Sequence, residues 1–341
     1  MTNRNRIVKC AATGIFAFFF LFALPAAAFA QELIPVGQTV GIEMHTDGVL
    51  VAGLSGVTTG SGDVTPAADA GIQPGDIIIR IGRNNIVSAN DFIAAIQSLD
   101  GTPVAVTLKR GEKLIQYTVT PAADADGAWK MGLLLRDGIS GIGTITFYDP
   151  ETGLFGALGH PINDSETGVT LPLSEGFITS ASVASVQKGE NGAPGELHGC
   201  FDVGSKLGNI FYNTSCGIFG VCDTALEGTA VETAPNAEIK VGPAVIISQV
   251  SGAESREFDI EICRIYRGEE ERLMILVTDP ELLALTGGIV QGMSGSPILQ
   301  DGRLIGAVTH VLLSDPTRGY GITIDSMLRA AESARELAQA S

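Results

Sequence analysis

The hydrophobic pattern between Ile34 and Pro121 predicts a small domain of strands and two short helices. Short apolar runs alternate there with Gly, Pro and polar turns, which is typical of strands joined by tight connections. Gly71 follows a helical pattern as a typical C-cap, and Ser88 precedes another as a typical N-cap. We predict helices over 66–70 and from Ser88, and strands over 40–44, 49–51, 77–81, 104–109 and 114–119.

We interpret residues 122–137 as a linker and a first strand, and a second pattern begins after them. Residues 138–341 contain many short strands separated by turns, an arrangement that favours a sandwich or a barrel. The alternation of apolar and charged residues over 257–262 is that of a strand with one face in solvent. The alanine-rich segment 325–340 predicts a long helix that packs on the barrel. The predicted strands include 138–147, 176–187, 238–250, 257–266 and 273–277.

The first 30 residues are a targeting segment. Arg4, Arg6 and Lys9 precede an apolar run over 10–29, and the segment ends in the small-residue site Ala28-Phe29-Ala30. The run is also long enough to approach the ~20 residues that span a bilayer. We expect a cleaved secretory signal or a retained N-terminal anchor, and in both cases the remaining chain outside the cytosol.

Charge and cysteine content narrow the partners. The chain carries 21 Lys and Arg against 38 Asp and Glu, a net charge of −17, so we predict no nucleic-acid partner. After the targeting segment an even number of cysteines remains, which permits disulfides in three pairings: Cys200, Cys216, Cys222 and Cys263. His198 lies near Cys200, but the spacings lack the C-x₂-C pair typical of zinc sites. We predict no metal and no organic cofactor.

A serine between glycines is the strongest candidate for a nucleophile. Gly287–Val311 contains Gly292-Met293-Ser294-Gly295-Ser296-Pro297, in which the glycines permit a sharp turn that exposes Ser294 Oγ. The backbone N–H groups of Gly292 and Ser294 would then converge as the donors of an oxyanion hole. A plain Gly/Ser hairpin turn fits this hexapeptide equally well. Ser296 is a rival nucleophile, although it lacks a following glycine.

The chain has four histidines, so the search for a general base is short. His160 stands between a glycine and a proline, which hold its backbone in a restricted, extended form. His310 alternates with apolar residues of a strand after the serine turn, and a structural role is favoured for it. Residues 138–327 are long enough for a double β-barrel of the trypsin type, in which a histidine in the first barrel serves a serine in the second.

The segment A-D-A-G-I-Q-P-G-D-I-I at 68–78 resembles the PDZ domain. That resemblance implies that an exposed strand edge binds an extended peptide and that a glycine-containing loop holds its terminal carboxylate. The matching residues here are Val40, Gly41, Ile42 and Glu43. The charge of Glu43 disfavours carboxylate capture, so strand addition is the better expectation, and a permanently docked structural module is the alternative.

Four further motifs resemble the SpoIVB peptidase family, the stage IV sporulation protein B type. They are G-H-P-I-N-D at 159–164, T-D-P at 278–280, G-G-I-V-Q-G-M-S-G-S-P-I at 287–298 and I-G-A-V-T-H-V at 305–311. That family joins a membrane-targeted segment, a PDZ domain over 34–121 here, and a trypsin-like serine peptidase domain over 138–341. The implied fold is mainly β, with a PDZ domain followed by a double β-barrel and a C-terminal helix.

Carried over by motif, the resemblance implies that Ser294 is the nucleophile, His160 the general base and Asp279 the acid that orients the base. Asp164, four residues after His160, is a rival acid, although an aspartate so near more often forms a turn. A neutral histidine is required because a serine hydroxyl is too weakly acidic to attack an amide unaided.

The function implied by the resemblance is that of an exported serine endopeptidase in endospore formation. Such a peptidase cleaves itself and a membrane-bound regulatory protein in the space between the forespore and mother-cell membranes, and so triggers a late mother-cell sigma factor. The PDZ ligand would be a peptide, with the chain's own N-terminal segment among the candidates. The alternatives are an extracytoplasmic quality-control PDZ protease and a catalytically silent PDZ scaffold.

Overall fold

Two closed six-stranded barrels form the larger part of the fold. The computed structural model describes residues 31–268 and 271–340, so the targeting segment lies outside the described residues. In the order β11-β12-β15-β14-β13-β2, each strand pairs with the next. The first barrel closes because the two end strands of this order, β11 and β2, also pair with each other. Its strands are β2 (Thr39–Leu54), β11 (Leu133–Tyr148), β12 (Leu154–Ala157), β13 (Leu173–Gln187), β14 (Glu196–Thr214) and β15 (Gly217–Cys222).

The second barrel follows in the chain and carries two of the helices. Its strands are β17 (Gly242–Ser248), β18 (Arg256–Tyr266), β19 (Arg272–Val277), β20 (Pro297–Gln300), β21 (Arg303–Leu312) and β22 (Asp315–Thr323). Helix α3 (Pro280–Thr286) lies between β19 and β20, and α4 (Ile324–Ala340) follows β22. The predicted C-terminal helix is confirmed, because the buried Met327 and Ala331 of α4 pack with Phe147 and Phe219 of the first barrel.

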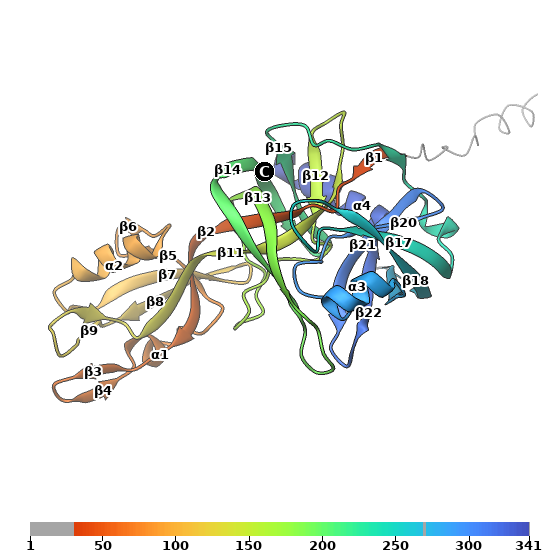
Figure 1. Cartoon of the computed structure of the whole chain (residues 1–341). Coiled ribbons are helices and arrows are strands. Elements are labelled where there is room, and N and C mark those ends of the chain that lie inside the picture. The colour runs from red at the N-terminus through yellow and green to blue at the C-terminus, as the bar shows by residue number, and fades with distance from the viewer. Residues whose placement is uncertain (1–30, 269–270, 341) are drawn as a thin grey trace, which may run out of the picture. The chain divides into compact units, whose positions relative to one another are not determined.

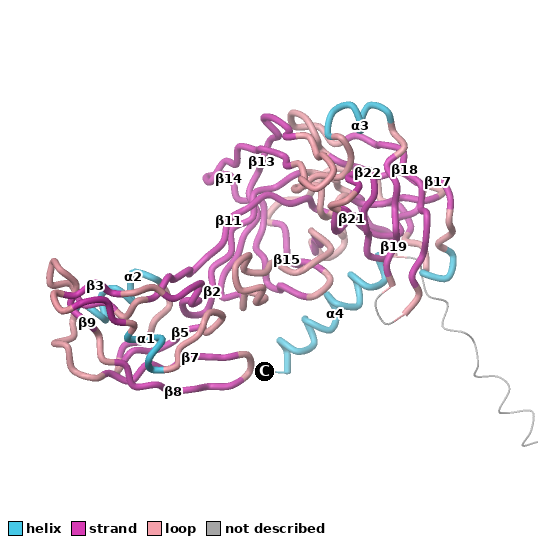
Figure 2. The backbone as a smooth tube through the Cα atoms, turned by 90° about the horizontal axis from the view of Figure 1, so that it is seen from below, coloured by secondary structure: helices cyan, strands magenta, loops and turns pink. Residues whose placement is uncertain are grey.

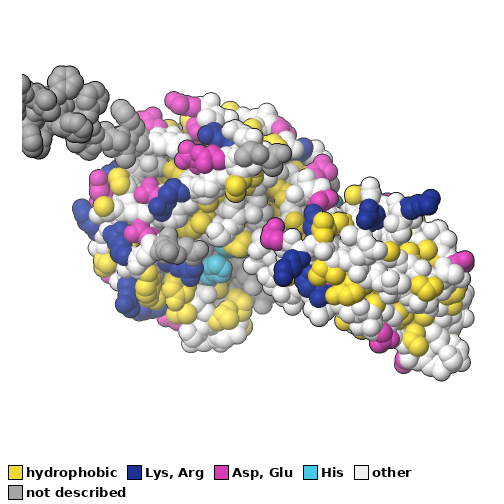
Figure 3. Space-filling model, turned by 180° about the vertical axis from the view of Figure 1, so that it is seen from behind, with side chains coloured by type: hydrophobic (Ala, Val, Ile, Leu, Met, Phe, Trp, Pro, Cys, Tyr) yellow, Lys and Arg dark blue, Asp and Glu magenta, His cyan; other side chains and the backbone are white. Residues whose placement is uncertain are grey.

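Short elements connect or extend the two barrels. The strand β1 (Glu32–Pro35) pairs with β11 and with β16 (Val231–Glu232), and a 3-10 turn, η1, covers Asn236–Glu238. Figure 3 shows basic and acidic side chains interspersed among hydrophobic ones over the face seen there. None of the helices within residues 31–268 and 271–340 is both long and apolar enough to span a membrane.

The small α+β domain lies between β2 and β11 in the chain. Its elements are β3 (Val57–Thr59), β4 (Gly62–Val64), α1 (Pro66–Ala70), β5 (Ile77–Ile81), β6 (Asn84–Asn85), α2 (Ala89–Gln97), β7 (Val104–Arg110), β8 (Lys113–Val119), β9 (Ala122–Ala123) and β10 (Trp129–Lys130). The predicted helices and hairpin are confirmed. Gly71 ends α1 with φ of 97°, and the side chains of Ser88 and Asp91 form a capping box at the start of α2.

The small domain is an insertion in the first barrel rather than a separate module in front of it. β2 and β11 are each 16 residues long and pair from Thr144↔Thr39 in the barrel to Leu133↔Leu54 in the small domain. Figures 1 and 2 both show the two strands side by side over this course. The predicted boundary at Ile34 is therefore displaced, because β1 and the first half of β2 pair with barrel strands. One apolar core fills the inserted domain, from Val49 to Met131.

Candidate active site

Ser294 lies in the turn between α3 and β20, and the peptide planes of this turn are fixed. The carbonyls of Gln291 and Met293 each accept a backbone N–H, at 2.9 and 3.0 Å. In a trans peptide the N–H points away from the carbonyl of the same plane. The N–H groups of Gly292 and Ser294 are therefore directed to the other side, and within residues 31–268 and 271–340 neither donates a hydrogen bond. The turn thus presents the two donors that the sequence predicts for an oxyanion hole.

A buried threonine of the first barrel holds the same turn. The backbone N–H of Thr144 donates to the carbonyl of Ser294 at 3.0 Å, and its hydroxyl donates to the carbonyl of Gly292 at 2.7 Å. Gly295 has φ of 98°, and a Cβ at this position would overlap the carbonyl oxygen of Thr144. Glycine is required here both by the left-handed backbone and by this close approach.

His160 follows a bend at the end of β12. Leu158 and Gly159 have φ of 69° and 71°, and for leucine this conformation is strained. The imidazole Nδ1 lies 2.9 Å from the carbonyl oxygen of Pro161. A proton on Nδ1 satisfies this contact and leaves Nε2 as an acceptor, the form that a general base needs. Burial lowers the pKa of His160, and the Pro161 carbonyl opposes the change in part, so the ring is neutral at neutral pH.

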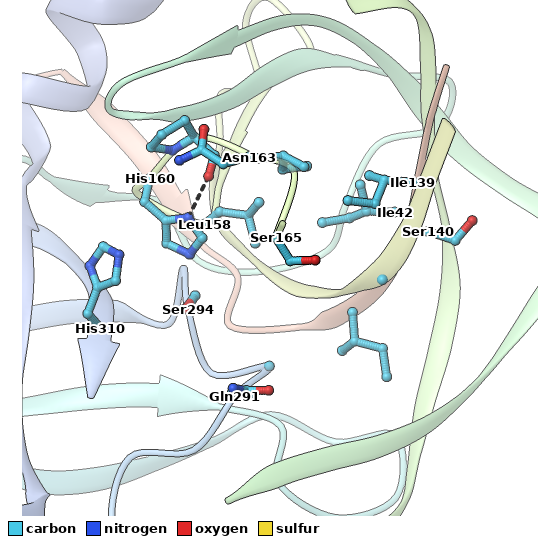
Figure 4. Close-up of a pocket in the computed structure, with 15 residues that line it drawn as sticks. Ile42, Ile139, Ser140, Leu158, His160, Asn163, Ser165, Gln291, Ser294 and His310 are labelled. Atoms are coloured by element: carbon cyan, nitrogen blue, oxygen red, sulfur yellow. Dashed lines mark hydrogen bonds between the residues drawn. The ribbon is translucent and has the colours of Figure 1, made fainter. Parts of the chain in front are cut away.

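His160 and Ser294 line one pocket of about 720 Å³. Figure 4 shows the His160 imidazole above Ser294, with His310 to the left of both. The Ser294 hydroxyl donates to the carbonyl of Thr309 at 2.7 Å. A hydroxyl held by Thr309 has to turn about χ1 before its Oγ can bond to His160, and catalytic hydrogen bonds often form only when substrate is bound. Apolar side chains cover much of the pocket wall: Ile42, Ile139, Ile142, Leu158 and Ile162.

His310 also belongs to this site, which the strand pattern alone did not favour. Its ring centroid lies 4.9 Å from that of His160, with the planes tilted by 37°. Burial lowers the pKa of His310, and the positive charges of a protonated His160 and of Arg272 lower it further. Protonation of one imidazole therefore disfavours protonation of the other, because two positive charges this close repel each other. The motif I-G-A-V-T-H-V at 305–311, which contains His310, was the sequence signal for its place at the pocket.

Comparison with known proteins identifies the family. Residues 127–328, which are more than half of the chain, match the SpoIVB peptidase S55 family, and residues 59–110 match the PDZ domain. The chain belongs to the SpoIVB peptidase S55 family. Its double barrel carries the matched region, and the inserted α+β domain is the PDZ domain.

Curated relatives of this S55 family member share only part of its length. A Clostridium perfringens protein assigned by name to the zinc metalloproteases is 26% identical over 113 residues, 33% of this chain and 32% of that protein. Serine protease HTRA1 of Xenopus tropicalis is 42% identical over 57 residues, 17% of this chain and 12% of that protein. The chain thus spans about a third or less of these relatives.

Two solved structures are also similar in part. The PDZ domain of the SdrC-like protein of Listeria monocytogenes is 32% identical, covers 26% of this chain and 87% of that one, and has a TM-score of 0.21. An inactive mutant of Rv3671c from M. tuberculosis is 11% identical, covers 58% of this chain and 82% of that one, and has a TM-score of 0.35. Scores this low add nothing about function.

Asp279 is not brought to the pocket. It is the N-cap of α3, where Oδ1 accepts from the N–H of Leu282 at 2.8 Å and Oδ2 accepts from the N–H of Asp259 at 3.4 Å. The position that an orienting acid takes, beside Nδ1 of His160, is filled by the Pro161 carbonyl. The predicted role of Asp279 as the third member of the triad therefore has no support in this geometry.

The two rivals, Asp164 and Ser296, are both structural. Asp164 is fully buried and accepts hydrogen bonds within its own turn and from Arg136. Ser296 is fully buried as well, and its hydroxyl donates to Ser248 Oγ at 3.0 Å. Of the two serines in the turn, Ser294 alone lines the pocket.

The predicted peptide-binding residues, Val40 to Glu43, are misplaced. They lie in β2 inside the first barrel, where β11 pairs with one edge and β13 with the other. No strand edge is left there for a peptide to join. Gly41 is small because Thr179 and Phe201 on neighbouring strands pack where its side chain would be, and not because it forms a loop.

The groove of the PDZ domain lies elsewhere, between α2 and the start of β11. A cavity of about 460 Å³ is lined by Phe92, Ile93 and Ile96 of α2 and by Met131, Leu133 and Leu135. Residues 133–136 of β11 pair with β2 on one edge, and within the described chain no strand pairs with the other. Gly132 has φ of 76° at the entrance of this edge. The signal was the run Met131-Gly132-Leu133-Leu134-Leu135, a glycine within an apolar segment.

The four cysteines in the described part of the chain form no disulfide. All four free thiols, Cys200, Cys216, Cys222 and Cys263, are separate, so the structure forms none of the three possible pairings. Burial, with a smaller effect of the Asp223 charge, raises the pKa of Cys222 to about 11. Within residues 31–268 and 271–340 there is also no group of three His, Cys, Asp or Glu that could hold a metal ion.

Proposed function

We propose that the chain is a serine endopeptidase in which Ser294 attacks the peptide carbonyl and His160 is the general base. The observation that carries this proposal is the meeting of His160, Ser294 and two unpaired backbone N–H groups at one pocket, on loops from two different barrels. Membership of a peptidase family supports the same chemistry.

The reaction follows from the groups present. After rotation of the Ser294 side chain, Nε2 of His160 accepts the hydroxyl proton as Oγ bonds to the substrate carbonyl carbon. The carbonyl oxygen becomes an oxyanion, and the N–H groups of Gly292 and Ser294 stabilise it without reorganising, because their peptide planes are already held. His160 then gives the proton to the leaving amine. A water molecule then attacks the acyl group on Ser294 with His160 again as general base, and the acyl group leaves as a carboxylic acid.

A backbone carbonyl has the orienting role in this geometry. The Pro161 carbonyl oxygen accepts a hydrogen bond from Nδ1–H of His160, so the ring has the tautomer that leaves Nε2 free. A carbonyl dipole stabilises an imidazolium less than a carboxylate does, so we expect slower acylation than in a peptidase with a complete triad.

The PDZ groove supplies a second contact with peptides. An extended segment can add to the open edge of β11 with its side chains in the apolar groove along α2. We infer that this groove holds a segment of the substrate or of the chain itself, and so raises its local concentration at the pocket.

We further propose that the peptidase acts outside the cytosol in sporulation signalling, on itself and on a membrane-bound regulatory protein. The family match and the N-terminal targeting segment support this finer assignment. Deletion of the coding sequence should block spore formation after engulfment. Normal spore yield from the deletion strain would exclude this role and leave the peptidase chemistry untouched.

Labelling tests the peptidase chemistry directly. The full-length chain is incubated with a serine-reactive fluorophosphonate, and self-processing is followed on the same samples. Wild type and Ser296→Ala should be labelled, whereas Ser294→Ala should not, because Ser296 lies outside the pocket. Equal labelling of wild type and Ser294→Ala would place the nucleophile elsewhere, and no labelling or self-processing of either would favour a silent scaffold.

A further inference from the structure

The loop that carries His160 is closed around one buried carboxylate. We call residues 158–171, between β12 and β13, the histidine loop. Oδ1 of Asp164 accepts from the N–H groups of Glu166 and Thr167, at 3.2 and 2.9 Å, and from the Thr167 hydroxyl at 2.9 Å. The N–H of Asp164 donates to the carbonyl of Val169 at 2.9 Å. Asp164 therefore sets the shape of the loop from within.

The other oxygen of this carboxylate reaches outside the loop. Oδ2 of Asp164 accepts from Nη1 of Arg136, which lies on β11, and Nη2 of Arg136 lies 3.5 Å from Glu166 Oε1. Burial alone would raise the pKa of Asp164, but the hydrogen bonds of Thr167 and the charge of Arg136 lower it, so the group is ionised. A buried carboxylate tolerates the loss of its cation poorly, so this pair fixes the loop against β11.

The same loop provides the ring partner of His160. The imidazole is oriented by the carbonyl of Pro161, and both residues lie between the strand end and Asp164. A second anchor holds the base of the loop, where the Asn213 side chain accepts from the N–H of Ile162 and donates to its carbonyl, each at 2.9 Å. His160 and Pro161 directly precede these two anchors, so a shift at Asp164 reaches the imidazole through Ile162 and Pro161.

We propose that Arg136 is a positioning residue for His160, because its pairing with Asp164 holds the histidine loop where the imidazole can meet Ser294. The inference rests on the proposed peptidase function. Arg136 does not line the pocket and touches no reacting atom. Its strand also carries Thr144, which holds the serine turn, so β11 sets the positions of both loops relative to each other.

Substitution of each partner tests the proposal in the full-length chain. Arg136→Gln removes the charge, Arg136→Lys keeps it with a single donor group, and Asp164→Asn keeps the acceptor for the turn while removing the partner charge. Arg303→Gln is the matched control, because Arg303 forms a surface ion pair with Glu238 away from the pocket. The readouts are the rate of fluorophosphonate labelling at Ser294 and the pH titration of His160 in ¹⁵N-histidine NMR spectra.

We expect Arg136→Gln to slow labelling about 10- to 100-fold, the usual effect of a small misplacement of a reacting group. The His160 titration should move upward toward its ordinary midpoint, because a loosened loop exposes the ring. Arg136→Lys should recover most of the rate, and Asp164→Asn should repeat the effect of Arg136→Gln without adding to it in the double variant. Arg303→Gln should match wild type.

The proposal is overturned if folded Arg136→Gln and Asp164→Asn proteins keep the wild-type labelling rate and His160 titration and differ only in thermal unfolding. If Arg136→Gln fails to fold, the same comparison is made with Arg136→Lys, whose single ion pair should give an intermediate titration. Absence of Ser294 labelling in wild type would instead refute the peptidase function. The His160 titrations of the variants would still decide whether Arg136 positions the ring.

Discussion

Thr144 holds Ser294 across the boundary between the two barrels. Its N–H donates to the carbonyl of Ser294 at 3.0 Å, while its hydroxyl donates to the carbonyl of Gly292 at 2.7 Å. The serine belongs to the second barrel and the threonine to the first, so the oxyanion donors are oriented by the domain that also carries the histidine. Preorganisation of this kind is the largest single contribution to catalysis in most acyl-transfer sites.

Replacement of Thr144 by valine should reduce acylation with little change in shape. The carbonyl of Gly292 loses its hydroxyl partner, so the turn is free to reorient its donors. We expect fluorophosphonate labelling to fall about 10-fold, which is less than the ~100-fold loss typical when a donor itself is removed. Thr144→Ser keeps the hydroxyl and is the matched control. Equal rates for the valine and serine variants would show that this hydrogen bond is unimportant.

Gly295 and Gly302 differ in what surrounds them, although both have a left-handed backbone. Their φ values are 98° and 76°, but a Cβ on Gly295 would overlap the Thr144 carbonyl, whereas one on Gly302 would meet open space. Gly302→Ala should cost about 1 kcal/mol from backbone strain alone. Gly295→Ala should cost about 3 kcal/mol and also abolish labelling, because the turn must move. Urea unfolding of both variants measures the difference, and equal losses would contradict the assigned clash.

The pH profile of labelling should report the burial of His160. Burial lowers its pKa below the ordinary value of 6.5, so the base remains neutral, and active, into mildly acidic solution. The labelling rate should therefore fall with a midpoint below 6.5. A group whose pKa is lowered by folding contributes stability above its unfolded pKa, so the free energy of unfolding should also fall as the solution is acidified through the folded pKa.

His45 provides the control for this titration, because it is exposed and bonds only to Glu43 at 3.2 Å among the described residues. His45→Gln should leave the labelling midpoint unchanged. A wild-type midpoint at or above 6.5 would mean that the His160 ring is hydrated in solution, contrary to its burial in the pocket.

Peptide binding by the PDZ domain should depend on the groove along α2. Ile93 lines that groove and is 55% exposed, so Ile93→Asp removes apolar surface without disturbing the core. Leu114 of β8 is 68% exposed and does not line the groove, which makes Leu114→Asp a matched control. A phage library of random peptides with free carboxyl termini is selected on wild type. Selected peptides should bind Leu114→Asp as well as wild type, and should bind Ile93→Asp at least about 10-fold more weakly. Equal binding to both variants would place the ligand elsewhere.

The site residues that sequence identified are those that local backbone chemistry constrains. His160 stands between Gly159 and Pro161, and Ser294 stands beside Gly295, so short motifs already restrict both conformations. The pairing of these two loops agrees with the chain order of a trypsin-type double barrel. The helix caps at Gly71 and Ser88 were equally readable for the same local reason.

The predictions that did not hold depend on which distant strands pair. The sequence of Val40 to Glu43 resembles a PDZ loop. In the fold these residues form a strand whose second edge pairs with β13, which lies more than a hundred residues later in the chain. Asp279 has the sequence of a helix N-cap as well as that of a family acid, and in this geometry it is the cap. Leu133 and Leu135 were assigned to a linker and first strand, because nothing local reveals that their strand begins in one domain and ends in another.

The insertion between β2 and β11 has a consequence for how the chain reaches this structure. The first barrel cannot close until those two strands meet, yet the whole PDZ domain separates them in the chain, and joining distant segments is entropically costly. If the PDZ domain folds first, it holds the end of β2 beside the start of β11. The remaining residues of the two strands can then pair without a long loop having to close. The PDZ domain would thereby act as an internal folding nucleus for the peptidase domain. Substitutions in the PDZ core should delay the appearance of active enzyme even where they leave the pocket of the folded protein unchanged.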